Sequence, residues 1–100
     1  MPEHVKSGCV IESTHPSLAG HFPGRPVVPG VVLLDKVRAA AEEFHGAQRL
    51  TGLPQVKFLQ PLLPEQPFEI LLSGAPPRVS FTCRREAQVL CKGVLEFAAA

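Results

Sequence analysis

The spacing of apolar and polar residues predicts one long helix in the first half of the chain. In the stretch 31–46, apolar residues recur at the three- and four-residue spacing of a buried helix face: Leu33, Val37, Ala40 and Phe44. A proline just before this stretch and a glycine at its end are typical helix start and stop signals. Because the first turn is apolar on every side, we expect that end of the helix to be buried all round.

The second half reads as strands in which apolar and polar residues alternate, as in a half-buried antiparallel sheet. The connection between the last two strands is short, which predicts a hairpin. Prolines and glycines interrupt the segment His15–Gly30, so we expect a structured loop there. The pattern predicts an α+β fold with the helix packed on one face of the sheet. The predicted strands are Val5–Ile11, Leu53–Leu59, Phe68–Ser73, Arg78–Arg84 and Gln88–Phe97.

Composition narrows the class of protein. With 100 residues, 45% of them hydrophobic and 19% charged, the chain is expected to form a single globular domain over residues 1–100. Its small core makes oligomerisation a reasonable expectation. A net charge of +1 gives no basic face for nucleic acid. The sequence has neither an apolar run long enough to span a membrane nor the pattern of a signal peptide. Three cysteines without C-x-x-C spacing favour neither a disulfide framework nor a zinc site, so we expect a reducing compartment, the cytoplasm.

The candidate chemistry lies in residues 15–35, HPSLAGHFPGRPVVPGVVLLD. This segment places His21 in a stiff loop, Gly30 directly before the helix, and the only aspartate, Asp35, in the first half of the helix. The free N–H groups at a helix start can hold a developing oxyanion, and glycine allows close approach of a substrate. We expect Asp35 to be buried, and burial favours the neutral carboxyl that a general acid requires. A histidine is the natural partner base.

The same residues also have structural interpretations. A histidine in a proline-rich loop is often simply hydrogen bonded, and an aspartate near a helix start often interacts with the helix dipole. The other three histidines have no carboxylate or thiolate at ligand spacing, so a metal site is not favoured. Cys83 and Cys91 fall on the apolar faces of neighbouring strands, where we expect them to behave as small hydrophobic residues. Spacing alone leaves the catalytic and structural interpretations of His21 and Asp35 open.

The segment HFPGRPVVPGVVLLD resembles the signature loop and helix of the β-hydroxyacyl-[acyl-carrier-protein] dehydratases, which have the hotdog fold. HPSLAG upstream, VKFLQPLLPEQPFEI and CKGVLEF also resemble this family, so the similarity covers about His15 to Phe97. The fourteen-residue spacing from His21 to Asp35 matches that of the family's catalytic histidine and carboxylate. The chain resembles a short member, similar to dehydratases of aryl-polyene and pigment gene clusters.

The resemblance implies a sheet wrapped around one central helix. It also implies a homodimer, or a dimer of dimers, in which two sheets join edge to edge and each active site lies between protomers. His21 then removes the C2 proton of a 3-hydroxyacyl thioester, and Asp35 of the partner subunit protonates the departing hydroxyl, directly or through water. The Gly30 amide holds the thioester carbonyl. The residues implied to position the substrate are Phe22, Pro23, Val28 and Val31.

The implied reaction forms a trans-2-enoyl thioester in fatty-acid or polyene-type biosynthesis, with the acyl chain presented by an acyl carrier protein. It needs no metal or redox cofactor, because dehydration beside a thioester is acid–base chemistry. Arg84, Arg85 and Lys57 could meet the acidic surface of the carrier protein or the phosphate of its phosphopantetheine arm. Solvation of these three side chains at the surface is an equally good interpretation.

One departure from the family bears on the reaction. The carboxylate is Asp35, where single-function members carry glutamate, and aspartate is the choice in members that also isomerise the double bond. Two other kinds of function stay open. One is a thioesterase or an enoyl-CoA hydratase on the same fold, although thioesterase relatives usually lack the His-Phe-Pro-Gly loop. The other is a non-catalytic acyl-binding subunit.

Overall fold

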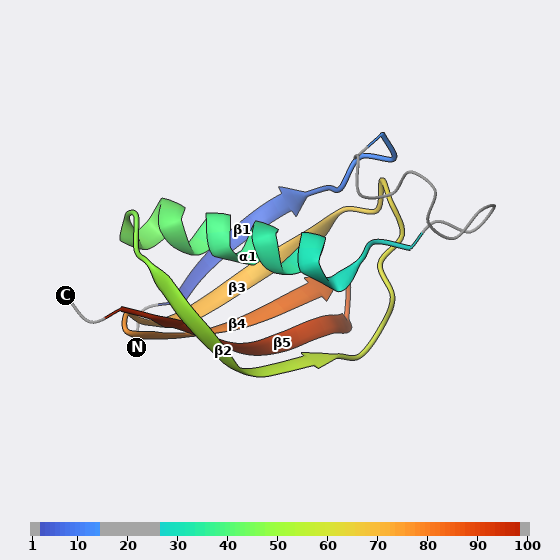
Figure 1. Ribbon diagram of the computed structural model, residues 1–100. Helices are drawn as coiled ribbons and strands as arrows, with labels where there is room; N and C mark the ends of the chain where they lie inside the picture. Colours follow the sequence, from blue (N-terminus) through green and yellow to red (C-terminus); the bar gives the residue numbers. More distant parts are fainter. Residues whose placement is uncertain (1–2, 15–26, 99–100) are drawn as a thin grey trace.

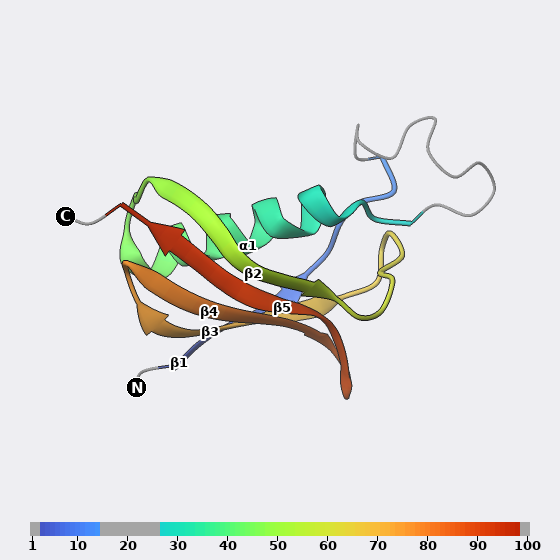
Figure 2. The ribbon, with the colours of Figure 1, turned by 60° about the horizontal axis from the view of Figure 1, so that its bottom comes forward.

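The computed structural model describes residues 3–14 and 27–98, which form a five-stranded antiparallel sheet crossed by one helix (Figure 1). The strand order is β1-β3-β4-β5-β2, so β1 and β2 are the two edges. Figures 1 and 2 show the sheet curving around one side of the helix. The elements are β1 (Glu3–Cys9), α1 (Gly30–His45), β2 (Leu50–Phe58), β3 (Phe68–Ala75), β4 (Arg78–Arg85) and β5 (Gln88–Phe97).

All the predicted elements are present, and the predicted α+β class is confirmed. The boundaries differ most in two strands: β1 ends at Cys9 instead of Ile11, and β2 begins at Leu50 instead of Leu53. The hairpin of β4 and β5 is confirmed, and its turn places Glu86 in the left-handed region with φ 56°. Of the predicted loop His15–Gly30, residues 15–26 lie outside the described residues.

The core lies between α1 and the inner face of the sheet. Alternate residues of β3 and β4 point inward and are buried, because successive side chains of a strand face opposite sides. The helix contributes one face to this core: Val32, Leu33, Val37, Ala40 and Ala41. The expectation that the first helical turn is buried all round is wrong, since Val31 is 73% exposed. The described part of the chain covers only one side of α1, so Val31 faces away from the sheet.

The helix end opposite Gly30 is held by ring contacts. Phe44, which the helical spacing assigned to the buried stripe, is 38% exposed, and its ring stacks on that of His4 with centroids 4.5 Å apart. His45 meets the edge of the same His4 ring at 5.3 Å. These contacts tie the start of β1 to the last turn of α1, so His4 and His45 serve packing between these two elements.

Cys83 and Cys91 behave as the sequence predicts. They face each other across β4 and β5, both are fully buried, and both are free thiols. The pKa of Cys83 is raised well above its usual range by the hydrogen bond with Cys91 and by burial of the thiol. A neutral, buried thiol is an inert packing group.

At Gly93 on β5, the core has no room for a side chain. A methyl group there would collide with the backbone carbonyl of Gln55 on β2 and lie 2.9 Å from Cζ of Phe81. We expect Gly93→Ala to destabilise the fold by about 2–3 kcal/mol, because the β2–β5 pairing must separate to admit it. For a domain of this size, that lowers Tm by on the order of 10 °C. Thermal unfolding followed by circular dichroism measures the effect.

Gly52→Ala on β2 is the matched control for this prediction. Its added methyl group would meet only Glu96 Oε1, at an ordinary contact distance of 3.8 Å. Its Tm should therefore stay close to that of the wild type, and equal losses in the two variants would contradict the steric explanation.

Candidate active site

The start of α1 and the segment after β2 enclose a hollow of about 420 Å³. Backbone hydrogen bonds hold its walls: the Val28 N–H donates to the Leu62 carbonyl at 2.9 Å, and the Leu59 N–H donates to the Leu90 carbonyl at 2.8 Å. Most of its lining is apolar, which suits an acyl chain. The lining residues are Val27, Val28, Gly30, Leu33, Phe58, Leu59, Gln60, Pro61 and Leu62.

The helix start opens into this hollow at Gly30. The Pro29 carbonyl accepts hydrogen bonds from the N–H groups of Val32 at 3.0 Å and Leu33 at 3.4 Å. No hydrogen bond within the described residues uses the N–H of Gly30 or Val31, and no side chain caps the helix there. The positive end of the helix dipole is therefore available to a carbonyl oxygen that enters the hollow.

Glycine is needed at position 30 because Phe58 packs directly against it. A Cβ at Gly30 would lie 2.7 Å from Cζ of Phe58 at the end of β2. The Phe58 ring is 53% exposed and so forms a wall of the hollow beside the helix start. A backbone without a side chain thus leaves room for both the aromatic ring and a group bound to the amide.

Asp35 lies on the side of α1 that faces away from the sheet, which corrects the expectation that it is buried. Its side chain is 69% exposed and pairs with Arg38 at 3.0 Å. The buried Leu33 does not surround the carboxylate, because Asp35 lies about 200° around the helix from it. Arg38 also pairs with Glu42 at 3.2 Å, so the carboxylate joins a surface network along the helix.

Val31 and Asp35 are four residues apart and therefore lie on the same exposed side of the helix. Further exposed apolar side chains lie on β2 and just after it, and β2 is an edge of the sheet. They include Leu53, Phe58, Leu59 and Leu63, each between 38% and 53% exposed. An apolar surface next to a free strand edge is typical of a protein–protein interface.

The structure places the site residues predicted from sequence only in part. Gly30 and Val28 line the hollow, whereas Val31 and Asp35 stand on the outward side of the helix. The predicted residues outside the described part of the chain are His21, Phe22 and Pro23. Phe58 and the segment 59–62 were not among the predicted site residues. The sequence feature that could have indicated this wall of the hollow is the run of large apolar residues at the end of the second predicted strand and between the prolines that follow it.

The three cationic residues predicted to meet a carrier protein have different surroundings. Arg84 is bound to Glu69 at 2.7 Å, whereas Arg85 and Lys57 form no ion pair within residues 3–14 and 27–98. In the same residues, no three His, Cys, Asp or Glu side chains are grouped as a metal site would require. None of the described helices is long and apolar enough to cross a membrane.

Comparison with known proteins identifies the family. The model of the family described as "ApeI-like: ApeI dehydratase" matches residues 2–94. The chain is 34% identical over 96 residues to a 3-hydroxyacyl-[acyl-carrier-protein] dehydratase FabZ of Caldicellulosiruptor saccharolyticus, covering 83% of this chain and 69% of the relative. It is 30% identical over 77 residues to the FabZ of Haemophilus influenzae, covering 68% of this chain and 52% of that protein. The chain thus spans about half to two thirds of these relatives' length.

Solved structures confirm the fold. The dehydratase heterocomplex ApeI:P from Xenorhabdus doucetiae matches with a TM-score of 0.84 and 22% identity, over 97% of this chain and 88% of that chain. An uncharacterised protein from Erwinia carotovora subsp. atroseptica matches with a TM-score of 0.76 and 21% identity, over 98% and 93% of the two chains. The sheet curved around a single helix is the hotdog fold that the sequence resemblance implied. The chain belongs to the ApeI-like family of hotdog-fold dehydratases.

Proposed function

We propose that this protein removes water from a 3-hydroxyacyl thioester carried by an acyl carrier protein, giving the trans-2-enoyl thioester. The observation that carries the proposal is the uncapped helix start at Gly30, which opens into an apolar hollow beside Phe58. A thioester carbonyl bound there would have its chain in the hollow and its oxygen at the positive helix end. Membership of a dehydratase family supports the same reaction.

In the proposed reaction His21 takes the proton from C2 of the substrate. Negative charge moves onto the thioester oxygen, where the Gly30 N–H stabilises it as the enolate forms. The electrons then form the C2–C3 double bond while the C3–O bond breaks. Asp35 gives a proton to the departing hydroxyl, directly or through water, so that it leaves as water. Proton transfer from His21 back to Asp35 through solvent restores both groups for the next turnover.

We propose that the working form is a homodimer, alone or paired into a dimer of dimers, in which two β2 edges join. An unpaired edge strand exposes N–H and C=O groups that a second strand can satisfy. The exposed apolar side chains near this edge would be covered by the same contact, including Val31 and Phe58. Asp35 points away from its own sheet, which supports a site completed by the Asp35 of the partner subunit. The four residues proposed to position the substrate are Phe22, Pro23, Val28 and Val31.

A heteromeric alternative has its own support, since the matching structure from Xenorhabdus doucetiae is a heterocomplex. In that arrangement a related chain, instead of a second copy, would cover the β2 edge. In such a heteromer, this chain could be the non-catalytic subunit. The purified protein distinguishes the two, because a homodimer should form and turn over substrate without a second kind of chain.

The experiment that tests the reaction follows two products at once. The protein is incubated with 3-hydroxyacyl thioesters of several chain lengths, each presented on carrier protein and on coenzyme A. We expect the enoyl thioester to form while no free thiol appears. Release of free thiol would identify a thioesterase, and preference for coenzyme A would indicate a hydratase working in reverse. Formation of neither product would favour an acyl-binding subunit.

A further inference from the structure

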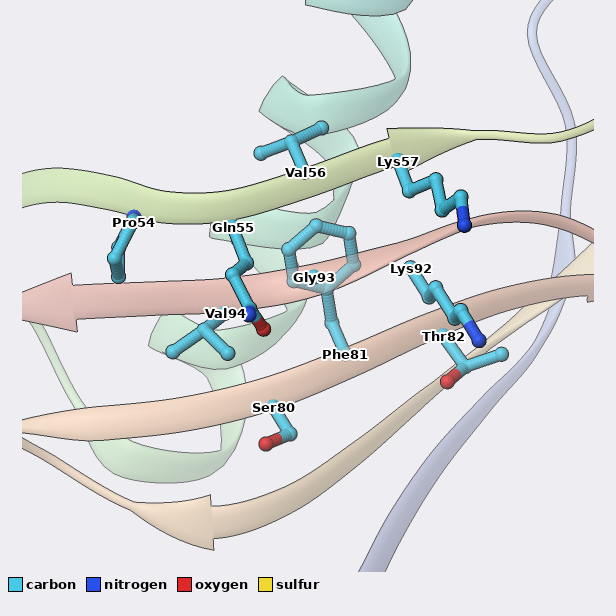
Figure 3. Close-up of a pocket in the computed structure, with 10 residues that line it drawn as sticks. All are labelled: Pro54, Gln55, Val56, Lys57, Ser80, Phe81, Thr82, Lys92, Gly93 and Val94. Atoms are coloured by element: carbon cyan, nitrogen blue, oxygen red, sulfur yellow. The ribbon is translucent and has the colours of Figure 1, made fainter.

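The outer face of the sheet, opposite α1, is hollowed over strands β4, β5 and β2 (Figure 3). This second hollow measures about 800 Å³, and among the described residues it shares none with the lining of the hollow at the helix start. Its polar side chains come from three neighbouring strands: Gln55, Lys57, Ser80, Thr82 and Lys92. It therefore has a lining unlike that of the apolar hollow at the helix start.

Two positive charges stand side by side in this outer hollow. Lys57 and Lys92 are directly opposite each other across β2 and β5, and both are exposed. Figure 3 shows the two side chains extending in the same direction, with Thr82 on the strand next to Lys92. Like charges directly opposite each other in a sheet destabilise it. The fold itself gains nothing from placing these two lysines together.

Among the residues that the structure describes, no acidic side chain pairs with either lysine. Two glutamates reach the outer face near the hollow, and both are already bound to arginine. Glu96 pairs with Arg78 at 2.9 Å, and Glu69 pairs with Arg84 at 2.7 Å. Within residues 3–14 and 27–98, neither Lys57 nor Lys92 forms an ion pair. The pair is thus a net positive surface that complements an anionic partner.

The lysine pair is also connected to the candidate active site through the backbone of β2. Lys57 is followed directly by Phe58, whose ring packs on Gly30 from the other face of the sheet. An anionic partner on the outer face would therefore sit at the same strand end that forms a wall of the apolar hollow. In a dimer joined through β2, the outer faces would be continuous, and the two lysine pairs would lie on one surface.

We propose that Lys57 and Lys92 form a docking surface for the acidic side of the acyl carrier protein that delivers the substrate. This inference rests on the proposed function. The surface takes carboxylates on the partner, while the hydroxyl of Thr82 and the amide of Gln55 add neutral hydrogen bonds beside the charges. Electrostatic docking of this kind raises the rate of encounter and weakens with salt.

The test reverses one charge at a time and compares two forms of substrate. Lys57→Glu and Lys92→Glu are measured with a 3-hydroxyacyl group on carrier protein and with the same group on pantetheine, which lacks the protein. We expect kcat/KM for the carrier-bound substrate to fall on the order of tenfold through KM, because the pair loses its net positive charge and with it the attraction for the acidic partner. Turnover of the pantetheine thioester should not change, and high salt should reduce the difference between variant and wild type.

Arg49→Glu is the matched control, because it makes the same change in net charge at an exposed position between α1 and β2. Figure 1 shows this connection at the end of the molecule opposite the helix start. Lys57→Glu should also keep or raise the Tm, since it turns a like-charge pair into an opposite-charge pair. A structural role for Lys57 would lower Tm and affect both substrates.

The outcomes separate this inference from the proposed function. Equal losses with both substrates, no loss with either, or the same loss in Arg49→Glu would overturn the docking surface while leaving dehydration intact. If the wild type turns over neither substrate, the proposed reaction fails, and binding of labelled carrier protein by fluorescence anisotropy decides the docking question. Binding that is weakened by both lysine variants supports the surface. Undetectable binding to the wild type rejects it.

Discussion

Asp35→Asn is expected to lower the rate of dehydration by about 10²–10⁴-fold, and His21→Ala by a similar factor. Each variant removes one of the two proton-transfer groups of the proposed reaction and leaves the other in place. Stability should change little in Asp35→Asn. The side chain is exposed, and its pairing with Arg38 is a solvent-screened surface contact that contributes at most about 1 kcal/mol. The measurement is the rate of enoyl thioester formation, together with thermal unfolding of each variant.

Glu42→Gln is the control for the aspartate variant. Glu42 is another exposed carboxylate of α1 that binds the same Arg38, and it lies two helical turns further along. It should keep nearly all of the activity. Full activity in Asp35→Asn would eliminate Asp35 as the proton donor. A collapse of stability in that variant would instead favour a structural role for the aspartate.

Mixing the two inactive variants His21→Ala and Asp35→Ala is expected to restore roughly a quarter of the wild-type activity. If His21 of one protomer works with the partner's Asp35, a mixed dimer has one site with both groups intact and one with neither, by two-fold symmetry. Random refolding of an equal mixture makes about half of the dimers mixed, and each of these has one working site of two. The measurement is the dehydration rate after the variants are denatured and refolded together.

Each variant refolded alone provides the baseline for this experiment, and mass spectrometry confirms that mixed dimers form. If His21 and Asp35 act within one chain, every site in the mixture keeps one defect and no activity returns. That result would reject the shared site and leave the dehydratase proposal standing. A purified wild type that stays a monomer of 10.8 kDa with full activity would reject the dimer itself.

The position of Asp35 bears on how protomers assemble. In a single protomer, the helix start, the apolar hollow and Phe58 lie on one side, and Asp35 projects from the outward side of α1. The exposed Val31 on this same side of the helix is poorly explained by the needs of the isolated fold. Its exposure is explained if another protomer covers that side, and Asp35 would then enter the proposed site formed by two chains.

The amino-acid sequence by itself determined the elements and their kind. Alternation in β4 and β5 places Phe81 and Cys83 inward, and the helical spacing of Leu33 and Val37 makes α1 amphipathic. Both are local patterns, since the period of a strand or helix decides which side chains share a face. The roles of His21, Gly30 and Asp35 came from the resemblance to a family motif and stay predictions, since His21 lies outside the described residues.

Only the tertiary structure decided what depends on contacts between distant segments. The sequence neighbours of Asp35 are apolar, yet the side chain is exposed, because the packing of α1 on one sheet selects which face is covered. The ring of Phe58 meets Gly30 because the end of β2 reaches the helix start. Lys57 faces Lys92 because of the register between β2 and β5. A shift of that register by one residue would turn every side chain of β2 to the other face, and no local pattern specifies that alignment.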